Sequence, residues 1–172
     1  MSKPPYSAGI LIYKHVNEHI YLLLGCDYKY NCWSDFGGKS EWIDSNDPIR
    51  TASREFYEET CGVIISEGLL YSKVKQHGVC VNCRSYNNHD YYMYLLNSKW
   101  IHINNDCETD FQKQQRVLLL TNHKSINKYI EKSEMQWRLL DDVLKSPESY
   151  RGVFKESVTR NYDFIYEKCV KV

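Results

Sequence analysis

Short runs rich in apolar residues recur through the first half of the chain, with alternation of apolar and polar positions near residues 78–83, as is typical of β-strands. Five runs carry this pattern: residues 8–14, 19–25, 32–37, 69–83 and 90–96. Residues 15–18 are polar and of a length that suits a hairpin loop between the first two runs. Gly78 is expected to interrupt the fourth run. The pattern therefore predicts a sheet formed mainly from the first hundred residues.

The clearest helix covers residues 48–61. Asp47 is a favourable N-cap, Pro48 takes the first helical position, where a missing N–H is harmless, and Gly62 follows as a stop. At 100° per residue, one side of this helix is apolar and is expected to face the core: Ile49, Ala52, Phe56 and Val63.

The second half of the chain is more mixed. Residues 99–132 are largely polar, with a helix expected near residues 122–132. Residues 135–140 suit a short strand, residues 141–146 the start of a helix, and residues 150–168 a final helix. No repeat or low-complexity linker divides the chain. We therefore expect one α/β domain over residues 1–172, with a mixed sheet sandwiched between helices.

The composition narrows the class of protein. Hydrophobic residues make up 42%, charged residues 26%, and the formal net charge is zero, which excludes a disordered chain and a bulk attraction to nucleic acid. The longest apolar runs, such as residues 117–120, are far shorter than a membrane span, and the N-terminus lacks the apolar stretch of a signal peptide. We therefore expect a cytoplasmic protein that does not contact a membrane.

The seven cysteines are scattered, and reduced thiols are their natural state in such a compartment. Cys80 and Cys83 form a CxxC pair, which is half of a zinc site, but no second CxxC or spaced His pair completes it. Packing thiols and a metal site both stay open for this pair.

The chemistry is concentrated in the helix over residues 48–61. Glu55, Glu58 and Glu59 lie about one turn apart, where like charges destabilise a helix by a few tenths of a kcal/mol each. Arg54 lies four residues before Glu58, where it can pair with that carboxylate. The glycines before the helix, including Gly38, allow a backbone carbonyl to approach a ligand. Clustered carboxylates with a carbonyl suit Mg²⁺ or Mn²⁺, whereas a solvated acidic helix face is the alternative.

This stretch resembles the Nudix box of the Nudix (MutT-type) hydrolases, G-x5-E-x7-R-E-U-x-E-E-x-G-U, where U is a bulky aliphatic residue. The box spans about residues 38–63, and these positions match it: Gly38, Asp44 in place of Glu, Arg54, Glu55, Phe56, Glu58, Glu59, Gly62 and Val63. Two extra residues precede Arg54, one extra residue precedes Gly62, and Phe56 replaces an aliphatic residue. Residues 99–128 have no counterpart in the pattern and are interpreted as an atypical insertion.

The resemblance implies the Nudix fold and a hydrolase that uses Mg²⁺, for which Mn²⁺ can substitute. It implies that Glu55, Glu58 and Glu59 bind metal together with the Gly38 carbonyl, that Arg54 positions the carboxylates, and that Asp44 braces the loop. The implied reaction is attack of an activated water on the diphosphate of a nucleoside diphosphate joined to another group. Nucleotides, dinucleotides and nucleotide sugars all remain candidate substrates.

A general base is also required. Glu131 is the first candidate and Glu134 the second, while a box glutamate such as Glu55 is the alternative. Lys39 and Trp33 are candidate substrate contacts, as a phosphate-binding cation and a surface for the base; solvation and core packing are the alternatives.

Two other functions stay open. An mRNA cap hydrolase needs a basic track for RNA, for which the insertion offers four residues: Lys113, Arg116, Lys124 and Lys128. A non-catalytic nucleotide-sensing module is the second, although such modules usually lose box glutamates and none is lost here. RNA is thus expected as a partner only in the decapping case, and a homodimer stays open.

Overall fold

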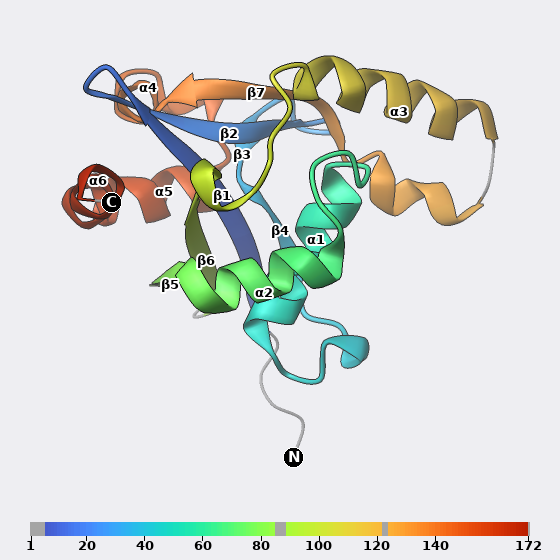
Figure 1. The fold of residues 1–172 in the computed structure, drawn as a ribbon, viewed down its shortest axis with the longest axis horizontal. Helices are drawn as coiled ribbons and strands as arrows, with labels where there is room; N and C mark the ends of the chain where they lie inside the picture. The colour runs from blue at the N-terminus through green and yellow to red at the C-terminus, as the bar shows by residue number, and fades with distance from the viewer. Residues whose placement is uncertain (1–5, 85–88, 122–123, 172) are drawn as a thin grey trace.

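The computed structural model describes residues 6–84, 89–121 and 124–171, which form one domain built on a mixed sheet (Figure 1). Its strands are β1 (Ser7–Val16), β2 (His19–Asp27), β3 (Trp33–Ser34), β4 (Phe36–Lys39), β5 (Val79–Arg84), β6 (Asp90–Asn97) and β7 (Lys132–Leu139). They pair in the order β3-β2-β1-β6-β5, with β4 paired to β1 and β7 to β2. Among the strand pairs of the described residues, β1 and β6 alone are parallel, so the sheet is mixed as the sequence predicts.

The hairpin between β1 and β2 is tighter than predicted. Val16 pairs with His19, so only Asn17 and Glu18 form the turn, and both have positive φ (48° and 66°). Two consecutive positive φ values are the signature of a type I′ turn, whose twist matches that of paired strands. The predicted four-residue loop over residues 15–18 is therefore wrong by two residues.

The predicted strand over residues 32–37 is divided in two by Asp35. Trp33 and Ser34 pair with β2, whereas the following Phe36–Lys39 segment pairs with β1. The chain thus crosses from one neighbour to the other at Asp35. This crossing places β4 alongside the centre of the sheet.

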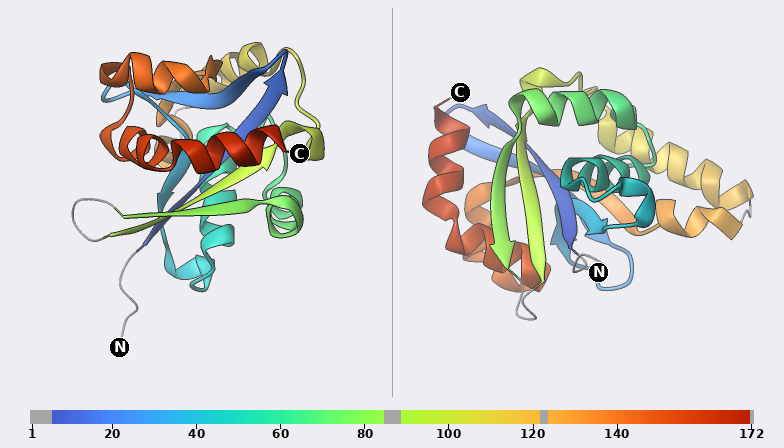
Figure 2. Two further views of the ribbon diagram at one scale, coloured as in Figure 1. Left: turned by 90° about the vertical axis from the view of Figure 1, so that its left-hand side faces the viewer. Right: turned by 90° about the horizontal axis from the view of Figure 1, so that it is seen from below.

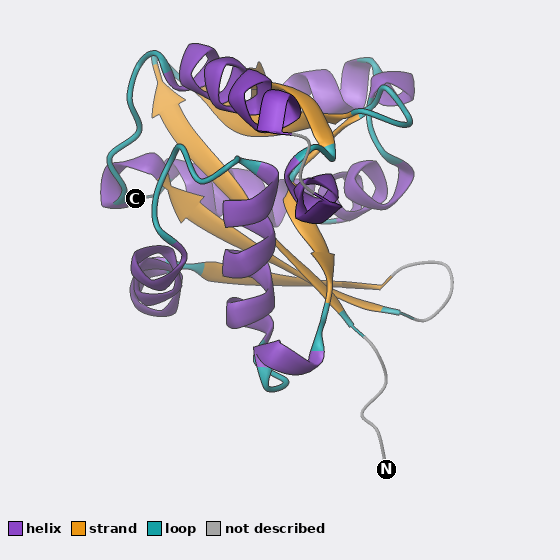
Figure 3. Cartoon of the chain, turned by 90° about the vertical axis from the view of Figure 1, so that its right-hand side faces the viewer, coloured by secondary structure: helices purple, strands orange, loops and turns teal. Residues whose placement is uncertain are grey.

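Helices cover both faces of the sheet, as Figures 2 and 3 show. The α-helices are α1 (Pro48–Glu59), α2 (Glu67–His77), α3 (Cys107–Thr121), α4 (Leu140–Lys145), α5 (Gly152–Arg160) and α6 (Tyr162–Val170). The 3-10 helices are η1 (Trp42–Asp44), η2 (Ser98–Trp100), η3 (Lys124–Tyr129) and η4 (Pro147–Ser149). One buried cluster joins the sheet to α1, α2 and α3, and a second joins it to α4, α5 and α6. The predicted sandwich of helices around a mixed sheet is confirmed.

Helix α1 forms as its local signals predict. Asp47 accepts hydrogen bonds from the N–H groups of Ile49 (2.9 Å) and Arg50 (3.4 Å), and Pro48 starts the helix. Ala52 and Phe56 are fully buried, as expected for its apolar side. The helix ends at Glu59, two residues before the predicted end, because left-handed conformations begin at Cys61 (φ 54°).

Residues 67–77 form a helix where the alternation predicts a strand, so the strand over residues 69–83 is a wrong prediction for most of its length. Leu70 and Val74 are the buried residues of α2, and their spacing of four is helical. Gly78 marks the boundary at which β5 begins. Short apolar runs do not distinguish helix from strand by periodicity alone, and here tertiary burial decides.

Two further predictions in the second half need correction. The helix expected near residues 122–132 is replaced by α3, which lies earlier in the chain, and by the short η3; residues 122–123 are outside the described part. The final helix over residues 150–168 is broken at Asn161 into α5 and α6. The short strand and the helix start near residues 135–146 correspond to β7 and α4. Within the described residues, no helix has both the length and the apolar character needed to cross a bilayer.

Candidate active site

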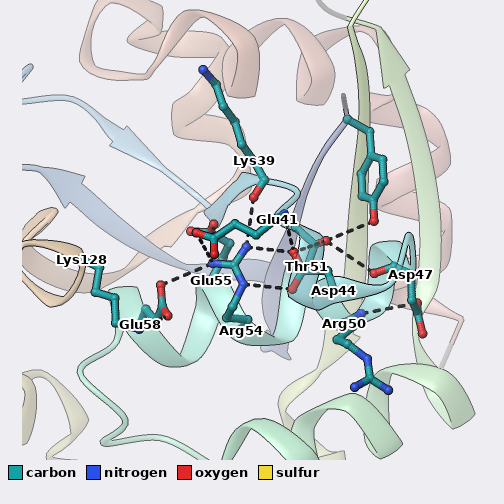
Figure 4. Close-up of polar contacts among 11 residues, drawn as sticks. Lys39, Glu41, Asp44, Asp47, Arg50, Thr51, Arg54, Glu55, Glu58 and Lys128 are labelled. Carbon is teal, nitrogen blue, oxygen red and sulfur yellow. Dashed lines mark hydrogen bonds and ion pairs between the residues drawn. The ribbon is translucent and has the colours of Figure 1, made fainter. Parts of the chain in front are cut away.

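Arg54 organises the centre of the site, as Figure 4 shows. Its Nε and Nη2 each donate to one carboxylate oxygen of Asp44 at 3.0 Å, a bidentate pair. Nη2 also donates to the Lys39 carbonyl (3.0 Å), and Nη1 donates to Glu55 (2.9 Å) and Glu58 (3.4 Å). One buried guanidinium therefore ties the loop before α1 to two of the three box glutamates.

Asp44 is the partner that holds this guanidinium in place. Its Oδ2 also accepts from the Glu41 N–H (2.8 Å) and the Thr51 hydroxyl (2.9 Å). Burial alone would raise the pKa of Asp44, but the hydrogen bonds from Arg54, Glu41 and Thr51 lower it below its ordinary value. The aspartate at this position therefore performs the bracing that the resemblance implies, in spite of its shorter side chain.

Glu55 packs directly against Gly38. A Cβ on Gly38 would lie 2.5 Å from the Glu55 Cδ, so any other residue would displace that carboxylate. Gly38 is needed because a side chain has no space there, and not because its backbone is left-handed. Among the described glycines, positive φ occurs at Gly62 and not at Gly38. Burial raises the pKa of Glu55 to about 7, although Arg54 opposes the rise.

Glu59 is the most deeply buried of the three carboxylates. It accepts from the Gly37 N–H (2.8 Å) and lies 3.5 Å from the Nζ of Lys132, whose side chain is fully buried. Lys132 also donates to the Ser34 hydroxyl at 2.8 Å. Burial raises the pKa of Glu59 to about 8 although Lys132 opposes the rise. No sequence signal marked Lys132, because it lies more than 70 residues from α1 and follows a polar segment.

Glu58 is held between two cations from different parts of the chain. Arg54 lies four residues before it on α1, at the predicted spacing, and Lys128 from η3 places its Nζ 2.5 Å from the other carboxylate oxygen. The side chain of Glu58 is 9% exposed, so both pairings lie at the edge of the core. The residues interpreted as an insertion therefore reach the box itself.

Of the two candidate downstream acids, Glu131 is the one that the structure brings to the carboxylates. Its negative charge raises the pKa values of both Glu55 and Glu59, and burial with the charges of Asp27 and Glu58 raises its own. Both acids are exposed, and Glu134 lies on β7, where it accepts from the Gln136 amide.

A cavity of about 600 Å³ opens beside the carboxylates. Its lining includes Gly37, Gly38 and Lys39 of β4, so the same strand contacts both the cavity and the box glutamates. Both polar and apolar side chains line the cavity: Asp35, Tyr91, Arg151, Val153 and Phe154. Its volume lies in the range of cavities that bind small organic ligands.

Asp35 and Tyr91 form the buried polar floor of this cavity. The Tyr91 hydroxyl donates a short hydrogen bond to Asp35, and burial raises the pKa of both groups above their ordinary values. None of the motifs in the sequence includes these residues or Arg151. A signal was present for Asp35 alone, since an acidic residue directly before Phe-Gly-Gly interrupts an otherwise apolar strand.

The two candidate substrate contacts have different positions. Lys39 is exposed and lines the cavity, so its side chain is available to a ligand. Trp33 is only 9% exposed, packs in the core cluster under α4 to α6, and has the Arg138 guanidinium 4.5 Å from its ring centre. The structure therefore favours core packing for Trp33 over stacking with a base.

The CxxC pair does not converge on one point. Cys80 is exposed and Cys83 is buried, because residues three apart on a strand point to opposite faces. This geometry favours separate thiols over half of a zinc site.

The donor set at the box fits a hard divalent cation. Three carboxylates and the Gly38 carbonyl offer oxygen donors, and burial raises the pKa values of Glu55 and Glu59, a rise that a bound cation would oppose. In this conformation the carboxylates turn to protein cations, and the part of the chain that the structure describes contains no group of three His, Cys, Asp or Glu side chains arranged as a metal cage. Metal binding at this site therefore requires the carboxylates to turn away from those cations.

No protein-family model and no curated protein matches the sequence, but solved structures share its fold. A Listeria monocytogenes protein described as a NUDIX hydrolase superposes with a TM-score of 0.54 at 10% identity, covering 99% of each chain. The Caenorhabditis elegans Ap4A hydrolase gives 0.50 at 15% identity, covering 95% of this chain and 99% of that one. The NUDIX domain of Shewanella oneidensis NrtR, solved with ADP ribose, gives 0.51 at 12% identity, covering 98% and 87%. The chain has the Nudix fold, as its box motif predicts.

Proposed function

We propose that the chain is a Mg²⁺-dependent pyrophosphohydrolase of the Nudix type, which cleaves the diphosphate of a nucleoside diphosphate joined to another group. One observation carries the proposal. Glu55 and Glu59 project from α1 toward β4, Glu58 lies beside them between Arg54 and Lys128, and β4 also lines a cavity of about 600 Å³. A diphosphate that lies along β4 would therefore place its bridge at the carboxylates and its nucleoside in the cavity.

The box residues would hold the metal. Glu55, Glu58, Glu59 and the Gly38 carbonyl supply the oxygen ligands, with Mn²⁺ an acceptable substitute for Mg²⁺. When bound, the cation would neutralise the diphosphate and lower the pKa of the attacking water. Arg54 would keep the carboxylates in position while they bind, because its bidentate pair with Asp44 does not depend on them.

Glu131 would accept the proton from the water at one of its carboxylate oxygens. A carboxylate that binds metal is a poor base, because the cation favours its charged form and lowers its pKa. Glu131 lies near the box glutamates but outside the set of ligands that the motif assigns, and burial raises its pKa. A base with a pKa closer to neutrality transfers protons more effectively at physiological pH.

The cavity would bind the nucleoside half. Arg151 and Lys39 offer cations to a phosphate at its mouth, and Asp35 and Tyr91 offer polar groups to a sugar or base. Val153 and Phe154 supply an apolar wall. This mixture of a few polar groups in a concave, partly apolar site is typical of small-molecule binding.

The free thiols support a cytoplasmic location. All seven cysteines are free, including the partly buried Cys32 and the exposed Cys80. Thiols persist in reducing compartments, so we place the activity in the cytoplasm.

A hydrolysis screen tests the proposal. Nucleoside triphosphates, ADP ribose, dinucleoside polyphosphates, nucleotide sugars and capped RNA would each be incubated with the protein and Mg²⁺, and products separated by ion-exchange chromatography. Cleavage of one class that stops with EDTA and returns with excess Mg²⁺ is the expected result. No cleavage of any class, or cleavage that EDTA does not change, would contradict the proposal. The capped-RNA arm tests the decapping alternative, for which the exposed Lys113 and Arg116 on α3 would be the RNA contacts.

A nucleotide-sensing module is the second candidate, and the similarity to the NrtR domain solved with ADP ribose supports it. Such a module would bind a nucleotide in the same cavity without turnover. The retained box glutamates favour the enzyme. Isothermal titration with each compound of the screen would distinguish the two, because only the sensor would bind tightly and leave the compound intact.

A further inference from the structure

The contact between Lys128 and Glu58 joins the 99–128 segment to the box. Nζ of Lys128 lies 2.5 Å from the Glu58 Oε1, and the side chain of Lys128 is 49% exposed. Glu58 accounts for the only ion pair of this lysine among the described residues, while its stem lies beside the Tyr129 ring (Nζ 5.1 Å from the ring centre). A flexible ammonium at half exposure gives up such a partner at little cost.

The backbone around Lys128 is anchored to the core, whereas its side chain is half-exposed. The carbonyl of Tyr129 accepts a hydrogen bond from the Cys61 thiol (3.1 Å), which anchors η3 to the end of α1. Ile126, two residues before Lys128, is buried. The ammonium is therefore confined to the neighbourhood of the box, yet it has the reach of four methylene groups within that space.

A divalent cation on Glu58 would compete with this lysine. Both would neutralise the same carboxylate, and two cations within a few Å repel each other. Arg54 does not face the same conflict, because Asp44 holds its guanidinium from the opposite side. Once the metal ion has displaced the Lys128 ammonium from Glu58, a substrate diphosphate can supply a new negatively charged partner for it.

We propose that Lys128 is an exchangeable counter-ion, which neutralises Glu58 in the resting protein and transfers to a substrate phosphate when the metal ion takes Glu58. Lys128 is thus a residue that couples metal binding to substrate binding. This inference rests on the proposed metal site. If Lys128 competes in this way, the metal ion binds the substrate-free protein more weakly than it would without Lys128. Substrate removes this competition, because its phosphate takes the ammonium.

Mn²⁺ titration without substrate, followed by the EPR signal of free Mn²⁺, tests the first half. Lys128→Met should bind Mn²⁺ about 2- to 5-fold more tightly than wild type, the range expected for loss of one partly exposed competing ion pair. Lys128→Arg should stay near wild type, because it keeps the cation. In the Glu58→Gln background, Lys128→Met should have no effect on the Mn²⁺ affinity, since the carboxylate for which they compete is gone.

Steady-state kinetics on the substrate found by the screen test the second half. Lys128→Met should raise KM roughly 10-fold, the loss expected for one hydrogen bond to a charged group. Lys99→Met is the matched control: it removes an exposed lysine from the same segment, whose Nζ lies 4.9 Å from the Trp100 ring centre and not at the box. It should leave both the Mn²⁺ affinity and KM unchanged.

The outcomes separate the two claims. If wild type binds no Mn²⁺, the proposed metal site is wrong and the inference fails with it. If wild type binds Mn²⁺ but Lys128→Met binds it equally or more weakly, the metal site stands and the exchange is wrong. If Lys99→Met tightens Mn²⁺ binding as much as Lys128→Met, the effect is one of overall charge, which also overturns the exchange. Melting temperatures of each variant with EDTA would show that the fold is intact.

Discussion

Arg54 and Lys128 pair with the same carboxylate, Glu58, yet they differ in burial and in partners. The Arg54 side chain is 8% exposed and pairs with four carboxylates, those of Glu41, Asp44, Glu55 and Glu58. The Lys128 side chain is 49% exposed and pairs with one. If the buried Arg54 moved away, buried carboxylates would be left without a cation, which is costly. The half-exposed Lys128 can move away at a small cost. The comparison separates a framework cation from an exchangeable one at a single site.

The two cations also differ in their distance from Glu58 along the sequence. Arg54 reaches Glu58 along one helix, four residues away, and reaches Asp44 through the loop just before it. Lys128 is 70 residues from Glu58 and reaches it only because η3 packs against the end of α1. The framework is therefore encoded locally, and the exchangeable contact depends on the tertiary fold.

Replacing Arg54 should have the largest effect on stability. Arg54→Met leaves the buried carboxylate of Asp44 without its partner, and breaking such a buried pair costs about 3–5 kcal/mol. We expect a melting temperature lower by about 10 °C or more, on a scale of about 2–4 °C per kcal/mol for a chain of this length. Arg50→Met on the same helix is the control, because Arg50 is exposed. Equal melting temperatures for the two variants would show that Arg54 is no framework residue.

The downstream acid should have the largest effect on turnover without an effect on the fold. Glu131→Gln keeps the shape of the side chain and removes the base, and we expect a loss of roughly 10²–10⁴-fold in single-turnover rate. Mn²⁺ affinity should change little, because Glu131 acts on the water and not on the metal. Glu134→Gln, three residues further along, is the control and should be near wild type. A dead Glu134→Gln with an active Glu131→Gln would move the base to Glu134, and two active variants would move it to the box.

The pH dependence of the metal-free protein should report on Glu59. Its pKa is raised to about 8 in the folded state, so the folded protein holds a proton that the unfolded chain has already lost above about pH 5. Stability from this group is therefore present at low pH and is lost as the pH rises through 8. Between pH 6 and 9 in EDTA we expect a loss on the order of 2 kcal/mol, seen as a falling melting temperature. Glu55, whose pKa is raised to about 7, contributes in the same direction.

Glu59→Gln supplies the control for that prediction. The variant removes the titrating group, so its melting temperature should vary less over pH 6 to 9 than that of wild type. Saturating Mg²⁺ should flatten the wild-type profile as well, because the cation stabilises the charged carboxylate. Identical profiles for the variant and wild type in EDTA would contradict the placement of Glu59 in a desolvated site.

The cavity should show the smallest of these effects, and in substrate affinity alone. Arg151→Gln removes one cation from the cavity and should raise KM roughly 10-fold with kcat nearly unchanged. Arg160→Gln on α5 is the control, because Arg160 is exposed and pairs with Glu156 away from the cavity. A fall in kcat at constant KM would place Arg151 in the chemical step instead.

The box helix could be predicted from the sequence because every signal that forms it is local. Asp47 and Pro48 start α1, Cys61 and Gly62 end it, and the four-residue spacing pairs Arg54 with Glu58. The Nudix fold followed from the same stretch. Helix α2 was assigned wrongly as a strand, because Leu70 and Val74 satisfy either period until their burial is known.

The rest of the site could not be predicted, because its residues meet only through the fold. Lys132 is a fully buried lysine at the start of β7, where sequence alone predicts a solvated charge. Tyr91 and Arg151 line the cavity from segments far from the box. Segment 99–128 was interpreted from the sequence as an atypical insertion. Its residues Cys107 and Phe111 are buried in the core, so it also contributes to stability, and point substitutions are better tests than deletion.

The claim that Glu58 holds the catalytic metal is tested most directly by Glu58→Gln, assayed with the substrate that the screen identifies. Glutamine keeps the shape of the side chain and removes the negative charge with which Arg54, Lys128 and a metal ion would interact. At saturating Mg²⁺ we predict a loss of turnover of roughly 10²-fold or more, on the scale of one essential polar group. The melting temperature in EDTA should stay within a few degrees of wild type. Near-normal turnover by Glu58→Gln at saturating Mg²⁺ would remove Glu58 from the metal site and contradict the account.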